Sequence, residues 1–205
     1  MDATLSPTPV WRSLLEPLTT TRGYRALTHH LLGLPLGVVY FTWFVTGLAL
    51  GLGLAVTLIG IPILTLVLAT VRPLLAGERV LANSLLDAGV PPAALAPGGE
   101  GWWGRFKAYW TDSATWRGLV YLVARFPIGI ATFTIAVTAY GVALGLVAAP
   151  LLAPLDALDL GFWEPSTVPE GLALLPLGLM LLLASAWISE GMAAGSRALA
   201  RWGAR

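Results

Sequence analysis

The chain has 205 residues, of which 57% are hydrophobic and only 11% are charged, and its net charge at pH 7 is +1. So much apolar surface cannot be buried inside one soluble domain of this length, so the composition excludes a soluble globular protein and indicates an integral membrane protein. Cysteine is absent from the sequence, which excludes disulfide bonds, a thiolate metal site and a cysteine nucleophile.

A short amphipathic segment precedes the first predicted membrane helix. Its large apolar residues recur at helical spacing, at Trp11, Leu14, Leu15 and Leu18. This pattern predicts a helix that lies on the inner leaflet. The first ~25 residues contain no continuous apolar core of the kind found in a cleavable signal peptide. We therefore expect the first membrane helix itself to direct insertion.

The first membrane hairpin is predicted from residues 31–71, which carry no charge. This run is about twice as long as the roughly 20 residues that span a bilayer. We place its crossings near residues 26–48 and 54–71, with the turn in the glycine-rich segment 47–53, because glycine permits a tight reversal. The amphipathic pattern of residues 74–86 predicts a further interfacial helix that faces lipid or a partner helix.

The second membrane hairpin follows a break rich in proline and glycine at residues 91–101 and an aromatic, basic stretch at residues 102–110. We place the third crossing near residues 118–146 and the fourth near 170–190, with an outer loop at 150–169 between them. The sequence therefore predicts an all-α polytopic membrane protein, with four transmembrane helices and additional interfacial amphipathic helices.

An internal repeat relates the two hairpins, because the pattern of residues 20–62 recurs in residues 112–154. Two membrane crossings fit between the start of one copy and the start of the next, and an even number preserves orientation. The repeat is therefore predicted to be parallel, with both hairpins facing the same way within a single membrane domain.

A proline and a glycine recur at matched depths in the first and third crossings, as Pro35-x-Gly37 and Pro127-x-Gly129. A proline inside a helix leaves a carbonyl one turn earlier without its usual N–H donor, which produces a fixed kink or a hinge. Glycines at such spacing also provide smooth faces for close helix packing. These four residues are candidate hinge residues, and packing is the alternative interpretation.

The cationic side chains lie on one side of the predicted membrane, and none falls in either outer loop. The positive-inside rule then predicts a multi-pass protein of the cell membrane with both termini cytoplasmic. The outer loop is acidic and also aromatic, and its candidate ligand-facing residues are Asp156, Asp159, Trp163 and Glu164. A cationic or amphipathic ligand would suit them, although Trp163 equally suits an anchor at the outer interface.

Three arginines near the inner ends of the first and third helices are candidate lipid or partner contacts: Arg25, Arg117 and Arg125. Arg25 and Arg117 would clamp lipid phosphates or pair with an acidic residue such as Glu78. Arg125 lies about two turns deeper, where a charge is costly unless it finds a partner or reaches the interface. The adjacent His29 and His30 point about 100° apart on a helix, so they do not converge on one metal.

No arrangement typical of catalysis occurs in the crossings. The sequence has no phosphate-binding loop, no paired histidine and carboxylate in a crossing, and no nucleophile beside a recognisable base. We therefore expect a protein that is not an enzyme and that has no cofactor and no metal site.

Several motifs together resemble a known family. They are Trp11-Arg12-x-Leu14-Leu15-x-Pro17, Arg25, Leu34-Pro35-Leu36-Gly37, the glycine-rich turn, and Asp112-x-Ala114-Thr115-Trp116-Arg117-x-Leu119-x-Tyr121. This set resembles the putative sensor domain family of actinobacterial membrane proteins, over nearly the whole chain. In that family the four-helix module is often joined to a histidine kinase, so the resemblance implies signal input through the membrane. No kinase domain follows the fourth helix here, so the expected output passes to another polypeptide.

Two functions fit these observations. The first is a non-enzymatic membrane sensor that passes a stimulus to a separate cytoplasmic or membrane partner, such as a signalling kinase. The alternative is a structural or regulatory subunit of a larger membrane complex such as a transporter, which would use the small-residue faces for packing. The expected partners are the lipid bilayer and either such a protein or further copies of this chain, without nucleic acid.

Overall fold

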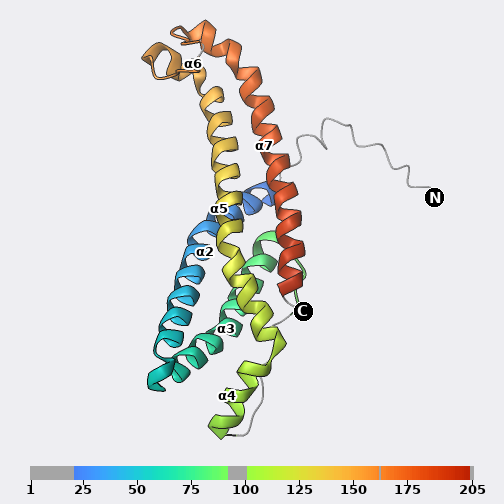
Figure 1. Cartoon of the computed structure of the whole chain (residues 1–205). Helices are drawn as coiled ribbons and strands as arrows, with labels where there is room; N and C mark the ends of the chain where they lie inside the picture. The colour runs from blue at the N-terminus through green and yellow to red at the C-terminus, as the bar shows by residue number, and fades with distance from the viewer. Residues whose placement is uncertain (1–20, 92–100, 162, 204–205) are drawn as a thin grey trace, which may run out of the picture. The chain divides into compact units, whose positions relative to one another are not determined.

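The computed structural model describes residues 21–91, 101–161 and 163–203, and these residues form helices and connecting turns without any strand. The elements in chain order are α2 (Thr21–Gly53), η1 (Ala55–Thr57), α3 (Gly60–Leu86), α4 (Gly101–Thr111), α5 (Ser113–Val147), α6 (Ala149–Leu152), η2 (Ala153–Leu155) and α7 (Val168–Gly203). Figure 1 labels the principal helices. The inner-leaflet helix predicted at residues 11–18 lies outside the described residues.

Within the described residues, four helices are long and apolar enough to cross a membrane: Gly23–Gly53, Gly60–Leu86, Ser113–Val147 and Val168–Trp202. Their length exceeds the roughly 20 residues that a bilayer requires. The prediction of an all-α polytopic membrane protein with four transmembrane helices is therefore confirmed. The helices are longer than the predicted crossings, because amphipathic flanks continue the same helices beyond their apolar centres.

The first hairpin reverses later than the sequence predicted. α2 continues through the glycine-rich segment to Gly53, and the reversal lies at residues 54–59, around η1. Gly47 and Gly51 instead permit close packing of α2 on α3, since an added Cβ would lie 2.5 Å from Val67 and 2.5 Å from Leu64. The glycines at these two positions therefore serve packing rather than the turn.

The interfacial helix predicted for residues 74–86 is the second half of α3, which continues past Pro73 without ending. Its apolar stripe is buried within the protein, at Leu75, Ala82 and Leu86. The amphipathic pattern therefore marks a face that packs against this chain's own helices, which agrees with the helix-packing alternative and not with the lipid-facing one. α4 is the aromatic stretch that the sequence predicted, and it contacts α3, where the Trp110 indole donates to the Thr65 hydroxyl at 3.4 Å.

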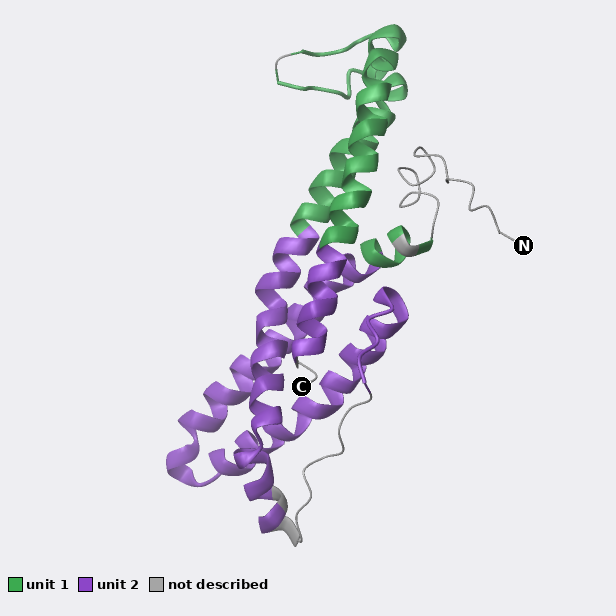
Figure 2. Ribbon diagram, turned by 90° about the vertical axis from the view of Figure 1, so that its right-hand side faces the viewer, with its two compact units in different colours: residues 1–27, 134–191 green, residues 28–133, 192–205 purple. Residues whose placement is uncertain are grey.

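The chain divides into two compact units (Figure 2). Unit 2 comprises residues 28–133 and 192–205, and its described part contains most of α2, all of α3 and α4, and the first part of α5. Its core contains Phe44, Leu68, Val71 and Leu122, all fully buried, from three helices. In this unit α2 and α3 form a hairpin, and the first part of α5 packs on both.

Unit 1 comprises residues 1–27 and 134–191, and its described part contains the end of α5, α6, η2 and most of α7. A small core forms around Leu146, Ala149 and Leu174. α7 approaches α5 and α6 closely at two glycines, because a Cβ on Gly171 would meet the Ala149 backbone at 2.5 Å and one on Gly178 the Val147 backbone at 2.7 Å.

Candidate functional site

Five polar side chains meet inside unit 2, and we call them the charged cluster: His29 and Tyr40 of α2, Glu78 of α3, and Tyr121 and Arg125 of α5. Arg125 Nε lies 3.2 Å from Glu78 Oε2, and the two side chains are only 3% and 2% exposed. Arg125 Nη2 lies 3.0 Å from His29 Nε2, and the Tyr121 hydroxyl lies 3.4 Å from Glu78 Oε2. The Tyr40 hydroxyl interacts with the same carboxylate. The cluster thus joins three membrane-spanning helices.

The contact between Arg125 and His29 fixes the proton position on the imidazole. A guanidinium is always a donor, so His29 Nε2 must accept, and the ring is neutral with its proton on Nδ1. Among the described residues, neither His29 Nδ1 nor Glu78 Oε1 has a hydrogen-bond partner. A buried polar atom left without a partner costs about 1–3 kcal/mol. The cluster therefore has hydrogen-bonding capacity that this arrangement does not use.

The helical repeat explains how these polar residues are buried. Glu78 follows Val71 and Leu75 by seven and three residues, so all three lie on the buried stripe of α3. Arg125 occupies the same position on α5, three residues after buried Leu122 and four before buried Gly129. Glu78 and Arg125 are therefore buried because each lies on the face of its helix that packs inside unit 2.

α2 and α5 cross beside the charged cluster at the two Pro-x-Gly sequences. A Cβ on Gly37 would lie 2.8 Å from Phe126 Cα, and one on Gly129 would lie 2.4 Å from the Gly33 carbonyl oxygen. The rings of Phe41 and Phe126 stack next to this contact, with centroids 4.6 Å apart. Only glycine allows two backbones to approach so closely. We call this contact the glycine crossing.

The glycine crossing is symmetric with respect to the internal repeat. Gly37 contacts the backbone of residues 125 and 126, and Gly129, its counterpart in the repeat, contacts that of residues 33 and 34, the counterparts of 125 and 126. The two copies therefore meet through the same surface, in an approximate two-fold arrangement with opposite local chain directions. α2 and α5 are the first helices of the two predicted hairpins, so their opposite directions at this contact do not support the parallel orientation that the repeat predicted.

The candidate hinge residues differ in their placement. Both prolines lie inside continuous helices and are exposed, whereas Gly37 and Gly129 are buried at the glycine crossing. The close packing that the sequence offered as an alternative is therefore present. A hinge motion at Pro35 and Pro127 stays a prediction.

The three candidate arginines also differ in their burial. Arg125, expected to contact lipid or a partner, is buried and pairs within the chain. Arg25 and Arg117 are exposed, and Arg117 Nε donates to the Ser113 carbonyl oxygen at 3.3 Å, so their lipid contacts stay predictions. Sequence reasoning missed the pairing of Glu78 with Arg125, although the position of Glu78 on the apolar stripe of α3 was a signal for it.

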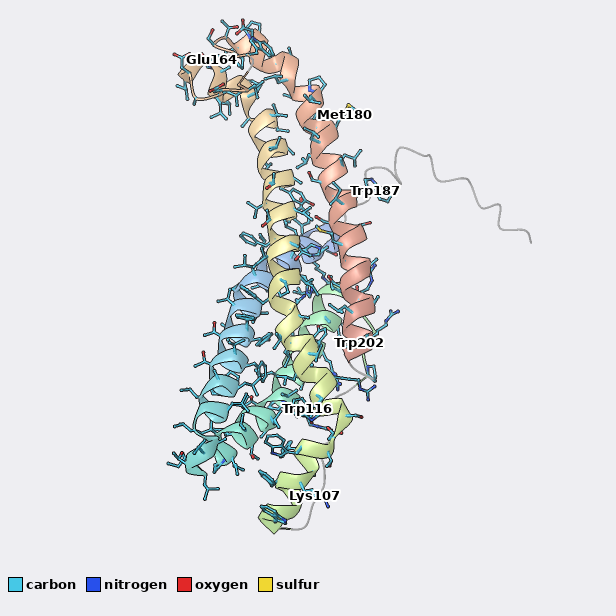
Figure 3. The ribbon with its side chains drawn as sticks, viewed as in Figure 1. Lys107, Trp116, Glu164, Met180, Trp187 and Trp202 are labelled. Carbon is cyan, nitrogen blue, oxygen red and sulfur yellow. The ribbon has the colours of Figure 1, made fainter. Side chains whose placement is uncertain are left out.

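The acidic outer loop contains carboxylates with local structural contacts. Asp159 Oδ1 accepts from the Gly161 amide at 2.6 Å, and Glu170 Oε2 accepts from the Ser166 and Thr167 amides at 2.8 and 3.1 Å. These bonds shape a turn and cap the start of α7. Asp156, Trp163 and Glu164 are exposed, and Figure 3 shows Glu164 in this loop. A ligand-facing role for the loop stays a prediction, and no group of metal-binding side chains occurs among the described residues.

An ion pair between α3 and Asp112, which lies just before the membrane-spanning helix α5, fixes the start of α5. Asp112 Oδ2 lies 2.6 Å from Arg72 Nη2, and the same oxygen accepts from the Thr115 amide at 2.8 Å. Asp112 is thus the N-terminal cap of α5. Partial burial alone would raise the pKa of Asp112, but the bonds from Thr115 and Arg72 outweigh it and lower the pKa to about 2.

We expect Asp112→Asn to remove a pH-dependent part of the stability. Because the pKa of Asp112 is lowered from 3.8 to about 2 on folding, its contribution is present above pH 3.8 and is lost as the pH falls toward 2. At neutral pH the wild type should be more stable than Asp112→Asn by on the order of 1 kcal/mol. The difference is small because the ion pair is partly exposed. Unfolding followed by tryptophan fluorescence from pH 6 to about 2 checks this.

Asp156→Asn, at an exposed turn position, is the matched control and should leave the stability close to that of the wild type at neutral pH. A difference between wild type and Asp112→Asn that persists undiminished at the lowest pH would contradict the assigned pKa.

The four apolar helices and the buried charged cluster define the class, a multi-pass α-helical membrane protein with an intramembrane polar site. The family model described as "Putative sensor" matches residues 29–202. The chain therefore belongs to this sensor family, and the matched range contains the whole charged cluster and the glycine crossing. No curated protein and no solved structure matches the chain.

Proposed function

We propose that this protein is a non-enzymatic membrane sensor in which the charged cluster changes state and the glycine crossing transmits the change. The observation that carries this proposal is the ion pair between Glu78 and Arg125, which is 2–3% exposed within membrane-spanning helices. A buried ion pair is a poor stabiliser, because desolvation offsets most of the attraction. Ionisable residues inside a membrane typically belong to a functional site.

A sensor needs two arrangements of similar free energy, so that a stimulus can shift the population between them. The unpartnered Glu78 Oε1 and His29 Nδ1 support a second arrangement, in which the same side chains exchange partners. A stimulus that separates Glu78 from Arg125 would also release His29, because Arg125 holds both. α2 and α5 would then repack at the glycine crossing, with Pro35 and Pro127 as hinges.

The output would pass to a separate protein. The cationic residues that flank the membrane helices support a cell-membrane protein with both termini cytoplasmic and a basic inner surface. A change at the glycine crossing would alter how this surface engages a signalling kinase or another regulator. The proposal needs no reaction within this chain.

The proposal is tested by extracting tagged protein from its native membrane in a polymer and identifying bound proteins by mass spectrometry. We expect a kinase or regulator to accompany the wild type, and Glu78→Gln to change its amount per folded protein. Glu164→Gln, the same substitution in the exposed outer loop, should leave that amount unchanged. A stoichiometric transporter bound equally to all three proteins would instead support the subunit alternative.

A further inference from the structure

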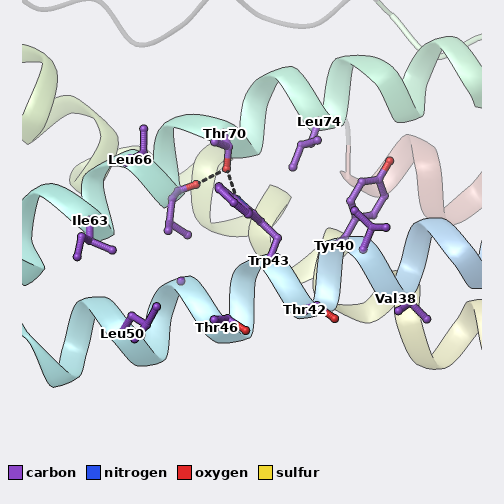
Figure 4. Close-up of a pocket in the computed structure, with 13 residues that line it drawn as sticks. Val38, Tyr40, Thr42, Trp43, Thr46, Leu50, Ile63, Leu66, Thr70 and Leu74 are labelled. Carbon is purple, nitrogen blue, oxygen red and sulfur yellow. Dashed lines mark hydrogen bonds between the residues drawn. The ribbon is translucent and has the colours of Figure 1, made fainter.

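A groove of about 760 Å³ runs between α2 and α3 in unit 2 (Figure 4). Its walls carry no charged residue and are formed by side chains such as Val39, Trp43 and Leu50 of α2 and Leu66 of α3. We call it the α2–α3 groove. Its volume lies in the range of about 300–1,000 Å³ that is typical of sites for small ligands.

The α2–α3 groove lies between two membrane-spanning helices, and several of its wall residues are exposed at the surface of this hairpin. Val39 is 60% and Leu66 61% exposed, and both lie within the spans Gly23–Gly53 and Gly60–Leu86. On α2 the groove extends from Val38 to Leu50, which at about 1.5 Å per residue is about 18 Å. Half of the roughly 30 Å hydrocarbon core is about 15 Å. The length of the groove therefore matches that of a lipid acyl chain that lies within one leaflet.

Two polar groups that line the α2–α3 groove, the Trp43 indole and the Thr70 hydroxyl, are already paired. The Trp43 indole donates to the Thr70 hydroxyl at 2.9 Å, as Figure 4 shows, and that hydroxyl donates to the Val67 carbonyl oxygen at 2.7 Å. An occupant therefore needs no hydrogen-bonding group at this point. The chemistry of the walls and the surroundings favour an apolar chain over a polar ligand.

We propose that the α2–α3 groove binds one acyl chain of a membrane phospholipid, and that binding of this acyl chain changes the contacts within the charged cluster. This inference rests on the proposed sensor function. Tyr40 makes the connection, because its side chain lines the groove while its hydroxyl interacts with Glu78. Tyr40 is only 7% exposed and belongs to the core of unit 2. An acyl chain that displaces the Tyr40 ring therefore moves a contact of the Glu78 carboxylate.

The binding is tested with the full chain in lipid nanodiscs that contain a phospholipid with a photoreactive group on one acyl chain. We expect labelling to concentrate on residues 38–50 and 63–74 and to be competed by excess unlabelled phospholipid. Thr46→Phe fills the groove and should reduce this labelling roughly tenfold, the equivalent of about 1.4 kcal/mol. Val45→Phe, on an adjacent exposed position outside the groove, should leave the labelling unchanged.

Wild-type labelling spread evenly over all four helices, or insensitive to competition, would overturn the inference without any variant. Equal labelling of Thr46→Phe and Val45→Phe would also overturn it. Tyr40→Phe removes the hydroxyl and should retain the labelling of the groove. In this variant, however, the bound acyl chain should no longer change the distance between α2 and α5, measured between spin labels on the two helices. If that distance responds to Glu78→Gln but no groove labelling occurs, the acyl-chain inference fails while the sensor proposal stands.

Discussion

Glu78→Gln is expected to destabilise the protein by about 3–5 kcal/mol, because it leaves the Arg125 guanidinium buried without its counter-charge. The two side chains are 2% and 3% exposed, so water cannot replace the lost carboxylate. The variant keeps the side-chain volume and the ability to accept from Tyr121, so the loss reflects charge rather than packing. Unfolding in mild detergent, followed by the fluorescence of the nine tryptophans, measures the effect.

The double variant Glu78→Leu with Arg125→Leu is the informative control. Replacing both charges by apolar side chains removes the desolvation cost of each, so its stability is expected to equal or exceed that of the wild type. The double variant should nevertheless lose the response to stimulus. A Glu78→Gln protein within about 0.5 kcal/mol of the wild type, the range of ordinary surface substitutions, would contradict the buried pairing.

Gly129→Ala is expected to separate α2 from α5 and to destabilise the protein by about 1–3 kcal/mol. The added Cβ would lie 2.4 Å from the Gly33 carbonyl oxygen, and a backbone atom cannot move aside as a flexible side chain can. Because the charged cluster lies beside this contact, the variant should also weaken the pairing of Arg125 with His29. The same unfolding measurement gives the first effect, and nitrogen NMR of labelled histidine gives the second.

Gly141→Ala is the matched substitution on the same helix, because a Cβ there meets no atom within 4 Å among the described residues. It should leave the stability within about 1 kcal/mol of the wild type, with any change favourable because alanine is the better helix former. Equal destabilisation by both substitutions would mean that the glycine crossing does not form as described.

The sequence predicted the membrane helices because their apolar runs have one physical explanation at this length. It did not predict the role of each glycine, since the same residue permits both a tight turn and close packing. Gly47 and Gly51 therefore indicated a turn, whereas they pack α2 on Val67 and Leu64 of α3. Distinguishing these roles requires knowledge of which face meets a neighbouring helix.

The candidate site was predictable in parts but not as a whole. The repeat identified Pro35-x-Gly37 and Pro127-x-Gly129 as equivalent, and Arg125 was recognised as a charge at a costly depth. Its counter-charge, Glu78, lies 47 residues away on another helix. Spacing along one helix cannot specify a contact between helices, so this pairing required the three-dimensional structure.

The central claim is that the charged cluster controls the glycine crossing, and a distance measurement tests it most directly. The chain has no native cysteine, so Val45→Cys on α2 and Val120→Cys on α5, both exposed, accept spin labels selectively. Electron paramagnetic resonance in nanodiscs then gives the distance distribution with Glu78 and with Glu78→Gln. We predict that the substitution shifts the population to a second distance. An identical distribution in the two folded proteins would contradict the claim.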